Sequence, residues 1–215
     1  QMGASVVLIE GAEMGGDCLN TGCVPSKALL AAGKAAEAMR QVGKFGIAPV
    51  EPQIDFAAVK DHVAAVIAGI APHDSQERFE ALGVTVLRDW ARFTGPREVE
   101  AAGHTIRARR FVIATGSHAA IPPIPGIEEV GYLTNETIFS LRDRPDHLLV
   151  LGGGPIGCEL AQAFARLGAE VTQVELAERV LIREDEDVST LARKALEASG
   201  VTVLTGHKAV RVEGK

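Results

Sequence analysis

A glycine-rich turn between an apolar run and an Ala- and Leu-rich run is the feature that most constrains the fold. Residues 147–151 (HLLVL) predict a buried strand, residues 155–168 (PIGCELAQAFARLG) a helix, and residues 170–175 (EVTQVE) a second strand. The turn carries glycines in the pattern G-x-G-x-x-G, at Gly152, Gly154 and Gly157. Strand, turn, helix and strand in this order predict a parallel βαβ unit, which a helix at about 188–199 and a strand at 201–206 extend.

These glycines and a carboxylate downstream predict a dinucleotide site. Glycine lets the backbone approach a pyrophosphate, and the helix N-terminus supplies free N–H groups. Glu175 ends the second strand 23 positions after Gly152, near the offset of about 20 expected for a carboxylate that binds a ribose 2′-hydroxyl. Because a carboxylate would repel a 2′-phosphate, NAD is favoured over NADP, although Arg179 and Arg183 leave NADP open. A turn that only permits tight helix–strand packing is the structural alternative. Glu10 also ends a strand-like run, which hints at two related nucleotide-binding units.

The first half of the chain predicts a less regular set of elements. Residues 5–10 (SVVLIE) form a short β-branched run typical of a buried parallel strand. Helices are expected at 26–43 and 54–83, and Pro72 should interrupt the second one. Short strand-like pieces then predict an antiparallel excursion before a buried strand at Arg110–Ala114.

Composition excludes several classes of protein. The 215 residues are 47% hydrophobic and carry a formal charge of −6, which is typical of a globular chain and argues against a nucleic-acid partner. We expect no membrane span, because no run approaches ~18 apolar residues, and we see no signal segment. Three cysteines are too few for a secreted disulfide scaffold, so a cytoplasmic location is expected.

Cys18 and Cys23, in residues 15–30 (GGDCLNTGCVPSKALL), leave three explanations open. A structural zinc site needs four ligands, and the scattered histidines offer no matching second pair, so no metal site is predicted. Two inert buried thiols would fit poorly with the polar, glycine-flanked surroundings. For a redox pair, Pro25 suits the first turn of a helix, so Cys23 would lie at or just before a helix N-terminus, where a thiolate is stabilised and its pKa lowered. Cys18 would lie further out on the loop as the exposed, attacking sulfur.

The same segment closely resembles the active-site segment of the class I pyridine nucleotide–disulfide oxidoreductases. The resemblance continues in VVLIE before it, in FVIATGSHAAIPPIPG and in LGGGPIGCELAQAFARLGAEVTQVE. It follows the family's order and covers nearly the whole chain. The segment GGDCLNTGC, together with IREDEDVS, looks most like the mercuric-reductase-like branch.

The resemblance implies FAD bound by the first unit and NAD(P)H bound by the second. Cys23 would be the sulfur against the flavin, and Cys18 the sulfur that exchanges with substrate. Lys27 would lie near the reactive edge of the flavin and pair with Glu159; without the family, a solvated helix lysine and a surface carboxylate would be the first explanations. The other implied FAD contacts are Glu10 on the adenosine ribose, the backbone at Gly15, Gly16, Asp17 and Cys18, and Thr115 with Gly116 over the cofactor. Electrons would pass from NAD(P)H through FAD to a Cys18–Cys23 disulfide.

Three departures from the family qualify this expectation. The family's first G-x-G-x-x-G would fall before residue 1, and its C-terminal dimerisation domain, with a His–Glu acid/base pair, would fall after Lys215. We therefore expect a fragment that alone lacks NADH-dependent disulfide reductase activity and binds FAD poorly. Asp17 stands where many members have threonine, and a carboxylate beside the pyrophosphate would be unfavourable unless it points to solvent.

The sequence thus predicts an α/β fold with two Rossmann-like nucleotide-binding units, both incomplete. The expected boundaries are an FAD-binding unit at 1–121, a linker at 122–145 and an NAD(P)-binding unit at 146–215. The expected function is a mercuric-reductase-like flavoprotein disulfide oxidoreductase, a homodimer at full length, acting on a small disulfide, dithiol or metal ion. Dihydrolipoamide dehydrogenase is the alternative enzyme, and a non-catalytic nucleotide-binding module is the alternative of another class.

Overall fold

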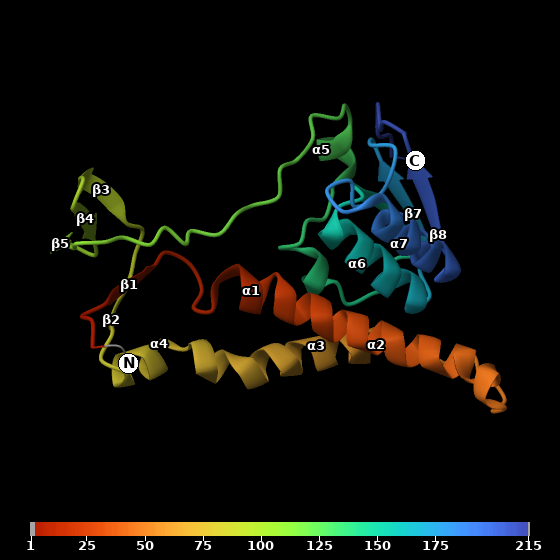
Figure 1. Cartoon of the computed structure of the whole chain (residues 1–215), viewed down its shortest axis with the longest axis horizontal. Coiled ribbons are helices and arrows are strands. Elements are labelled where there is room, and N and C mark those ends of the chain that lie inside the picture. The colour runs from red at the N-terminus through yellow and green to blue at the C-terminus, as the bar shows by residue number, and fades with distance from the viewer. Residues whose placement is uncertain (1–2, 215) are drawn as a thin grey trace. The chain divides into compact units, whose positions relative to one another are not determined.

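The computed structural model describes residues 3–214, which divide into two compact units (Figure 1). Unit 1 comprises the residues up to Val24 together with Ala65–His118. Unit 2 comprises Pro25–Ala64 together with the residues from Ala119 onward. Mixed helices and short strands make this an α/β fold whose sheets are small, in agreement with the predicted fold class.

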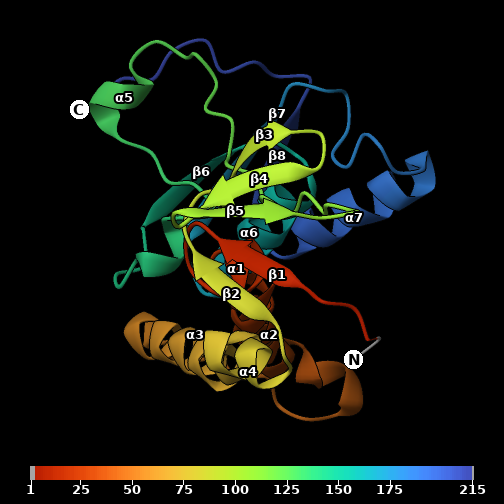
Figure 2. The same cartoon turned by 90° about the vertical axis from the view of Figure 1, so that its left-hand side faces the viewer.

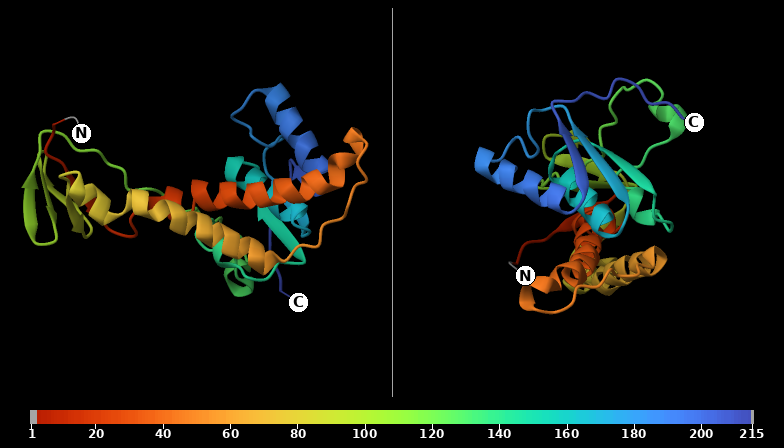
Figure 3. Two further views of the ribbon diagram at one scale, coloured as in Figure 1. Left: turned by 90° about the horizontal axis from the view of Figure 1, so that it is seen from below. Right: turned by 90° about the vertical axis from the view of Figure 1, so that its right-hand side faces the viewer.

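Unit 2 is built around a three-stranded parallel sheet with the order β6-β7-β8, whose strands lie side by side in the right-hand view of Figure 3. The strands are β6 (His147–Leu151), β7 (Glu170–Glu175) and β8 (Val201–Thr205), linked by α6 (Pro155–Arg166) and α7 (Glu186–Ala198). Right-handed crossovers in one direction place both helices on one face of the sheet, and α6 and α7 contact each other. The βαβ unit predicted from the sequence is therefore present, with all its elements in the expected order.

Helix α2 (Cys23–Gln41) contributes buried residues to unit 2 and contacts α6. A Cβ added to Gly33 would lie 3.3 Å from the Cβ of Arg166, so the two helices approach closely there. The Arg40 guanidinium donates to the carbonyl oxygen of Arg166 at 2.9 Å. Phe164 of α6, which is fully buried, meets Phe56 of α3 (Phe56–Ile70) with ring centroids 5.7 Å apart.

Unit 1 holds two further sheets (Figure 2). Strand β1 (Val7–Glu10) pairs in parallel with β2 (Thr85–Arg88), with Glu10 opposite Arg88. Strands β3 (Arg92–Gly95), β4 (Glu98–Ala101) and β5 (His104–Arg107) form an antiparallel sheet. The predicted antiparallel excursion is thus confirmed for β3–β5 and is wrong for β2, because β2 joins the parallel strand that carries Glu10.

The buried strand predicted at Arg110–Ala114 is wrong. Residues 108–124 have no regular secondary structure, and the side chains of Val112 and Ile113 are 90% and 73% exposed. An apolar run becomes a strand only when a neighbouring strand offers hydrogen-bonding partners. No strand among residues 3–214 pairs with this run.

The helices agree with the sequence more closely. Pro72 interrupts the long helical stretch, because a 3₁₀ turn (η2, Ala71–Asp74) separates α3 from α4 (Gln76–Ala81). Helix α2 is followed by the 3₁₀ turn η1 (Val42–Phe45), close to the expected end. The remaining short elements are α1 (Gly16–Asn20), α5 (Ile127–Val130) and η3 (Ile138–Ser140).

Candidate functional site

The glycine turn between β6 and α6 uses two of its glycines for reasons internal to the chain. Gly152 has φ +116°, a conformation that residues with a Cβ rarely adopt. A Cβ on Gly157 would lie 2.3 Å from the carbonyl oxygen of Gly152, so only glycine lets the helix start this close to the turn. The structural alternative, a turn that only permits tight packing, would be enough to explain glycine at these two positions.

Gly154 has no such internal reason. Its φ of −74° suits any residue, and nothing lies within 4 Å of the position where its Cβ would be. A side chain there would instead fill the open space in front of the N-terminus of α6. A turn that must let a pyrophosphate approach its backbone requires glycine at this position, so the residues present fit a dinucleotide.

Glu175 lies at the carboxyl end of β7, beside this turn. One carboxylate oxygen accepts a hydrogen bond from the Gly153 N–H, and the other accepts from the Ala177 N–H at 2.7 Å. Glu10 at the end of β1 has a matching arrangement, since it accepts from the Ala12 N–H at 2.8 Å. Each unit therefore places a glutamate at the end of a parallel strand and holds it with the amide two residues on.

Cys18 and Cys23 lie on consecutive helices. Cys23 begins α2, as expected, whereas Cys18 lies within the short helix α1, so its predicted place on a loop is wrong. A side-chain hydrogen bond with Cys23, followed by burial, raises the pKa of the Cys18 thiol. The two sulfur atoms are thus hydrogen-bonded neighbours. Both cysteines are exposed, so the predicted contrast between an exposed and a shielded sulfur is not seen.

Asp17 is turned toward the segment that contains Thr115 and Gly116. Its carboxylate accepts a hydrogen bond from the Ser117 N–H at 3.0 Å. Gly116 has φ +69°, and a Cβ there would lie 2.3 Å from the same carboxylate oxygen. The carboxylate is therefore held by a backbone amide of unit 1. Gly15 and Gly16, which precede it, also have positive φ, at +88° and +58°.

Lys27 and Glu159 form an ion pair in unit 2. The Lys27 Nζ lies 2.6 and 2.7 Å from the two carboxylate oxygens of Glu159. Lys27 follows Cys23 by one helical turn on α2, and Glu159 lies in the first turns of α6. The pairing thus connects the helix that begins at the second cysteine with the helix that begins at the glycine turn.

Comparison with known proteins shows the family to which the chain belongs. A model of the family described as pyridine nucleotide-disulphide oxidoreductase matches residues 1–215. The chain belongs to this family.

Relatives within the family are longer oxidoreductases. A mercuric reductase of Bacillus cereus is 35% identical over 99% of this chain and 34% of its own length. A dihydrolipoyl dehydrogenase of Thermus scotoductus is 39% identical over 100% of this chain and 46% of its own length. Among solved structures, the Cu(II) complex of the HOCl-induced flavoprotein disulfide reductase RclA from Escherichia coli has a TM-score of 0.79 at 28% identity, covering 97% of this chain and 45% of that one. The chain spans less than half the length of these proteins.

Two side chains near these family features escaped the sequence analysis. Trp90, the only tryptophan in the sequence, lies with its ring against Gly11, directly after Glu10, and is 69% exposed. Gln173 is completely buried in β7 beneath the glycine turn. The sequence could have indicated Trp90, because a single tryptophan follows a predicted strand. The position of Gln173 depends on tertiary contacts that no local sequence pattern reveals.

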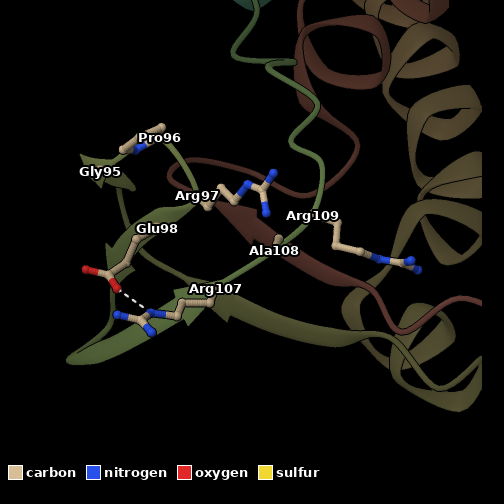
Figure 4. A pocket seen from close by; sticks show the side chains of 7 residues that line it. All are labelled: Gly95, Pro96, Arg97, Glu98, Arg107, Ala108 and Arg109. Carbon is tan, nitrogen blue, oxygen red and sulfur yellow. Dashed lines mark hydrogen bonds and ion pairs between the residues drawn. The ribbon is translucent and has the colours of Figure 1, made fainter.

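A surface cavity lies elsewhere in the chain. It has a volume of about 610 Å³ and lies beside β4 and β5 in unit 1 (Figure 4). Its arginines do not converge, because Arg107 turns to Glu98 while Arg109 points away from Arg97 (Figure 4). None of the predicted site residues lines it.

The part of the chain that the structure describes contains neither a metal-binding cluster nor a helix suited to span a membrane. Between residues 3 and 214, no group of three or more His, Cys, Asp or Glu side chains could hold a metal ion. None of the helices described is both long and apolar enough to cross a membrane.

Proposed function

We propose that the chain is the electron-transfer part of an FAD- and NAD(P)H-dependent disulfide reductase of the mercuric-reductase-like kind. The observation that carries the proposal is the hydrogen bond between the thiols of Cys18 and Cys23 at the start of α2. A disulfide requires two cysteines that lie close together, and two thiols that interact through their side chains are suited to form one. The glycine turn supplies the second requirement, a place for a nicotinamide nucleotide.

The residues of unit 1 fit FAD in three respects. Glu10 is arranged like Glu175 and would bind the adenosine ribose. The space around a Cβ of Gly16 is open, so the backbone there is accessible to a phosphate. The Asp17 carboxylate is held by the Ser117 N–H, which supports its placement away from the pyrophosphate. When bound, FAD would supply the exchange between a hydride donor and a two-electron thiol couple.

The thiols of the chain carry out the last step. Cys18 and Cys23 together lose two electrons and two protons when the S–S bond forms, and a substrate disulfide that gains them becomes two thiols. Because its pKa is raised, the Cys18 thiol holds its proton more strongly than an isolated cysteine does. Lys27, one turn further along α2, would hold positive charge near the flavin edge, with Glu159 fixing its position.

NAD is the preferred nucleotide in this proposal. Both oxygens of Glu175 already accept backbone N–H bonds, which hold the carboxylate in place for a ribose hydroxyl. Arg179, one of the two arginines (with Arg183) that left NADP open, donates to the carbonyl oxygens of Glu184 and Ile182 at 2.9 and 3.3 Å. Its guanidinium is thus engaged by the backbone, and this supports NAD.

Thiol counting tests the redox pair directly. Mild oxidation of the chain with diamide should remove two of its three thiols, and a Cys18→Ser/Cys23→Ser variant should lose none. The matched control, Cys158→Ser, should still lose two. Retention of all thiols by the wild-type chain would contradict a redox pair and favour a non-catalytic nucleotide-binding module.

Dihydrolipoamide dehydrogenase is the second candidate, because the Thermus scotoductus relative has the higher identity, 39% against 35%. Assays of the full-length flavoprotein with dihydrolipoamide plus NAD⁺ and with Hg(II) plus NADH would separate the two. Turnover with dihydrolipoamide alone would reject the mercuric-reductase-like assignment. A homodimeric assembly and a cytoplasmic location complete the proposal, on the family resemblance and the low cysteine content.

A further inference from the structure

A buried polar side chain beneath the glycine turn has no role in the proposed electron transfer. Gln173 is completely buried in the central strand β7 and lies in register between Val150 of β6 and Val203 of β8. Its Oε1 atom has no hydrogen-bond partner among the described residues. An apolar residue would avoid the cost of burying an unpaired oxygen, so the amide group calls for a reason.

The amide nitrogen of Gln173 supplies that reason. The Nε2 atom donates to the carbonyl oxygen of Gly152 at 2.9 Å and lies 3.6 Å from the sulfur of Cys158. The Cys158 thiol in turn donates to the carbonyl oxygen of Gly153 at 3.4 Å. Gln173 and Cys158 thus hold two successive carbonyl groups of the turn from the core side.

The geometry of the peptide group links these hydrogen bonds in the core to the N–H groups on the outer side of the turn. In a planar trans peptide the C=O and the following N–H point in opposite directions. A carbonyl of Gly152 held by Gln173 therefore turns the Gly153 N–H outward, where Glu175 accepts it. The position of the Glu175 carboxylate depends in this way on a side chain that it does not touch.

We propose that Gln173 is a positioning residue for the nicotinamide nucleotide, orienting the Gly152–Gly153 peptide and through it the carboxylate of Glu175. The identity of the ligand rests on the proposed function. The hydrogen bond from Gln173 to the Gly152 carbonyl does not depend on that function. Gln173 acts from beneath the turn and contacts no nucleotide. Its loss should weaken binding of the nucleotide while the sheet remains folded.

The first test removes the donor and keeps the shape. NADH binding by the full chain is titrated by fluorescence for the wild type and for Gln173→Met. We expect the dissociation constant to rise about 10-fold, the effect of losing one buried hydrogen bond. Val171→Ala is the matched control: Val171 is also buried in β7, two residues away on the same face. It should lower the melting temperature without changing the dissociation constant.

A second variant adds a readout that a packing role would not move. In Gln173→Glu, a protonated carboxyl can donate to the Gly152 carbonyl as the amide does, while an ionised one would repel it. NADH affinity of this variant, relative to wild type, should therefore fall as pH rises from about 6 to 9, because burial raises a carboxyl pKa toward that range. Gln173→Met should show no such dependence. Because the pH change is made on one folded protein, the comparison does not depend on a variant that fails to fold.

Hydrogen exchange separates this inference from the proposed function. In Gln173→Met the amides of Gly152 and Gly153 should exchange faster than in the wild type, with or without NADH. Faster exchange in a chain that never binds NADH would reject the proposed function and keep the positioning role. Wild-type exchange at both amides together with wild-type NADH affinity would overturn the role of Gln173.

Discussion

At the scale of single residues, the hydrogen bond between the thiols makes a prediction about reactivity. A thiolate reacts with iodoacetamide and a thiol does not. Because Cys23 raises the pKa of Cys18 through this bond, alkylation of Cys18 should set in at higher pH than for an isolated cysteine. Cys23→Ala removes the bond and should lower the pKa of Cys18.

Peptide mapping by mass spectrometry across a pH series measures this shift. The reduced wild-type chain and Cys23→Ala are compared, with Cys158→Ser as a control that should leave the Cys18 profile unchanged. Identical Cys18 profiles in wild type and Cys23→Ala would mean that the two sulfur atoms do not interact.

Lys60 makes a second prediction at this scale. It is buried in α3, 3.4 Å from the carbonyl oxygen of Ile138 and 5.3 Å from the centre of the Phe139 ring. Burial, followed by the charge of Arg142, lowers the pKa of Lys60 to about 8 from 10.5. Between these two pH values the unfolded chain holds a proton that the folded chain has lost, so stability should rise with pH across this window.

Thermal melts of the wild type and Lys60→Met would detect the effect. The melting temperature of the wild type, relative to the variant, should increase between pH 8 and 10.5, by about 2–4 °C for each kcal/mol gained. Lys194, on the surface helix α7, provides Lys194→Met as a control without this pH dependence. Parallel curves for wild type and Lys60→Met would show that Lys60 stays charged in the folded chain.

At the scale of elements, the same substitution at two positions of one turn should affect stability at one position and NADH binding at the other. Gly157→Ala brings a Cβ within 2.3 Å of a carbonyl oxygen and should lower the free energy of unfolding by about 1–3 kcal/mol. Gly154→Ala meets nothing within 4 Å and should leave stability unchanged while raising the NADH dissociation constant about 10-fold or more.

Denaturant unfolding and NADH titration of both variants separate the two effects. If Gly154→Ala bound NADH as tightly as the wild type, the open space before α6 would not be where the pyrophosphate lies. That result would favour the structural alternative, in which the glycines only permit tight packing of the turn.

At the scale of the whole chain, residues 108–124 differ from everything around them. They are extended, largely exposed and without regular hydrogen bonding. Proteases cut where the backbone is accessible and unprotected. Limited trypsin digestion should therefore cleave first after Arg109 or Arg110, and an Arg109→Gln/Arg110→Gln variant should lose that cut. Faster cleavage at Arg40, which is helical and hydrogen-bonded, would contradict the structure.

The sequence by itself determined the features that depend on local chemistry. Glycine at Gly152 is required by backbone conformation, and proline at Pro72 ends a hydrogen-bond ladder, so both patterns predict the same structure in any context. The βαβ unit followed from the order of apolar strand-like run, glycine turn, helical run and second strand. The segment containing Cys18 and Cys23 indicated the family, which the comparison with known proteins confirmed.

Only the tertiary structure decided which partners each segment meets. The run at Arg110–Ala114 has the composition of a strand and pairs with no strand among residues 3–214, because pairing needs a neighbour that composition does not supply. Strand β2 joins β1 rather than the antiparallel sheet, and the glutamine at position 173 lies beneath a turn more than 15 residues before it in the sequence. Local propensity acts over a few residues, whereas hydrogen bonds and burial depend on residues that are distant along the chain.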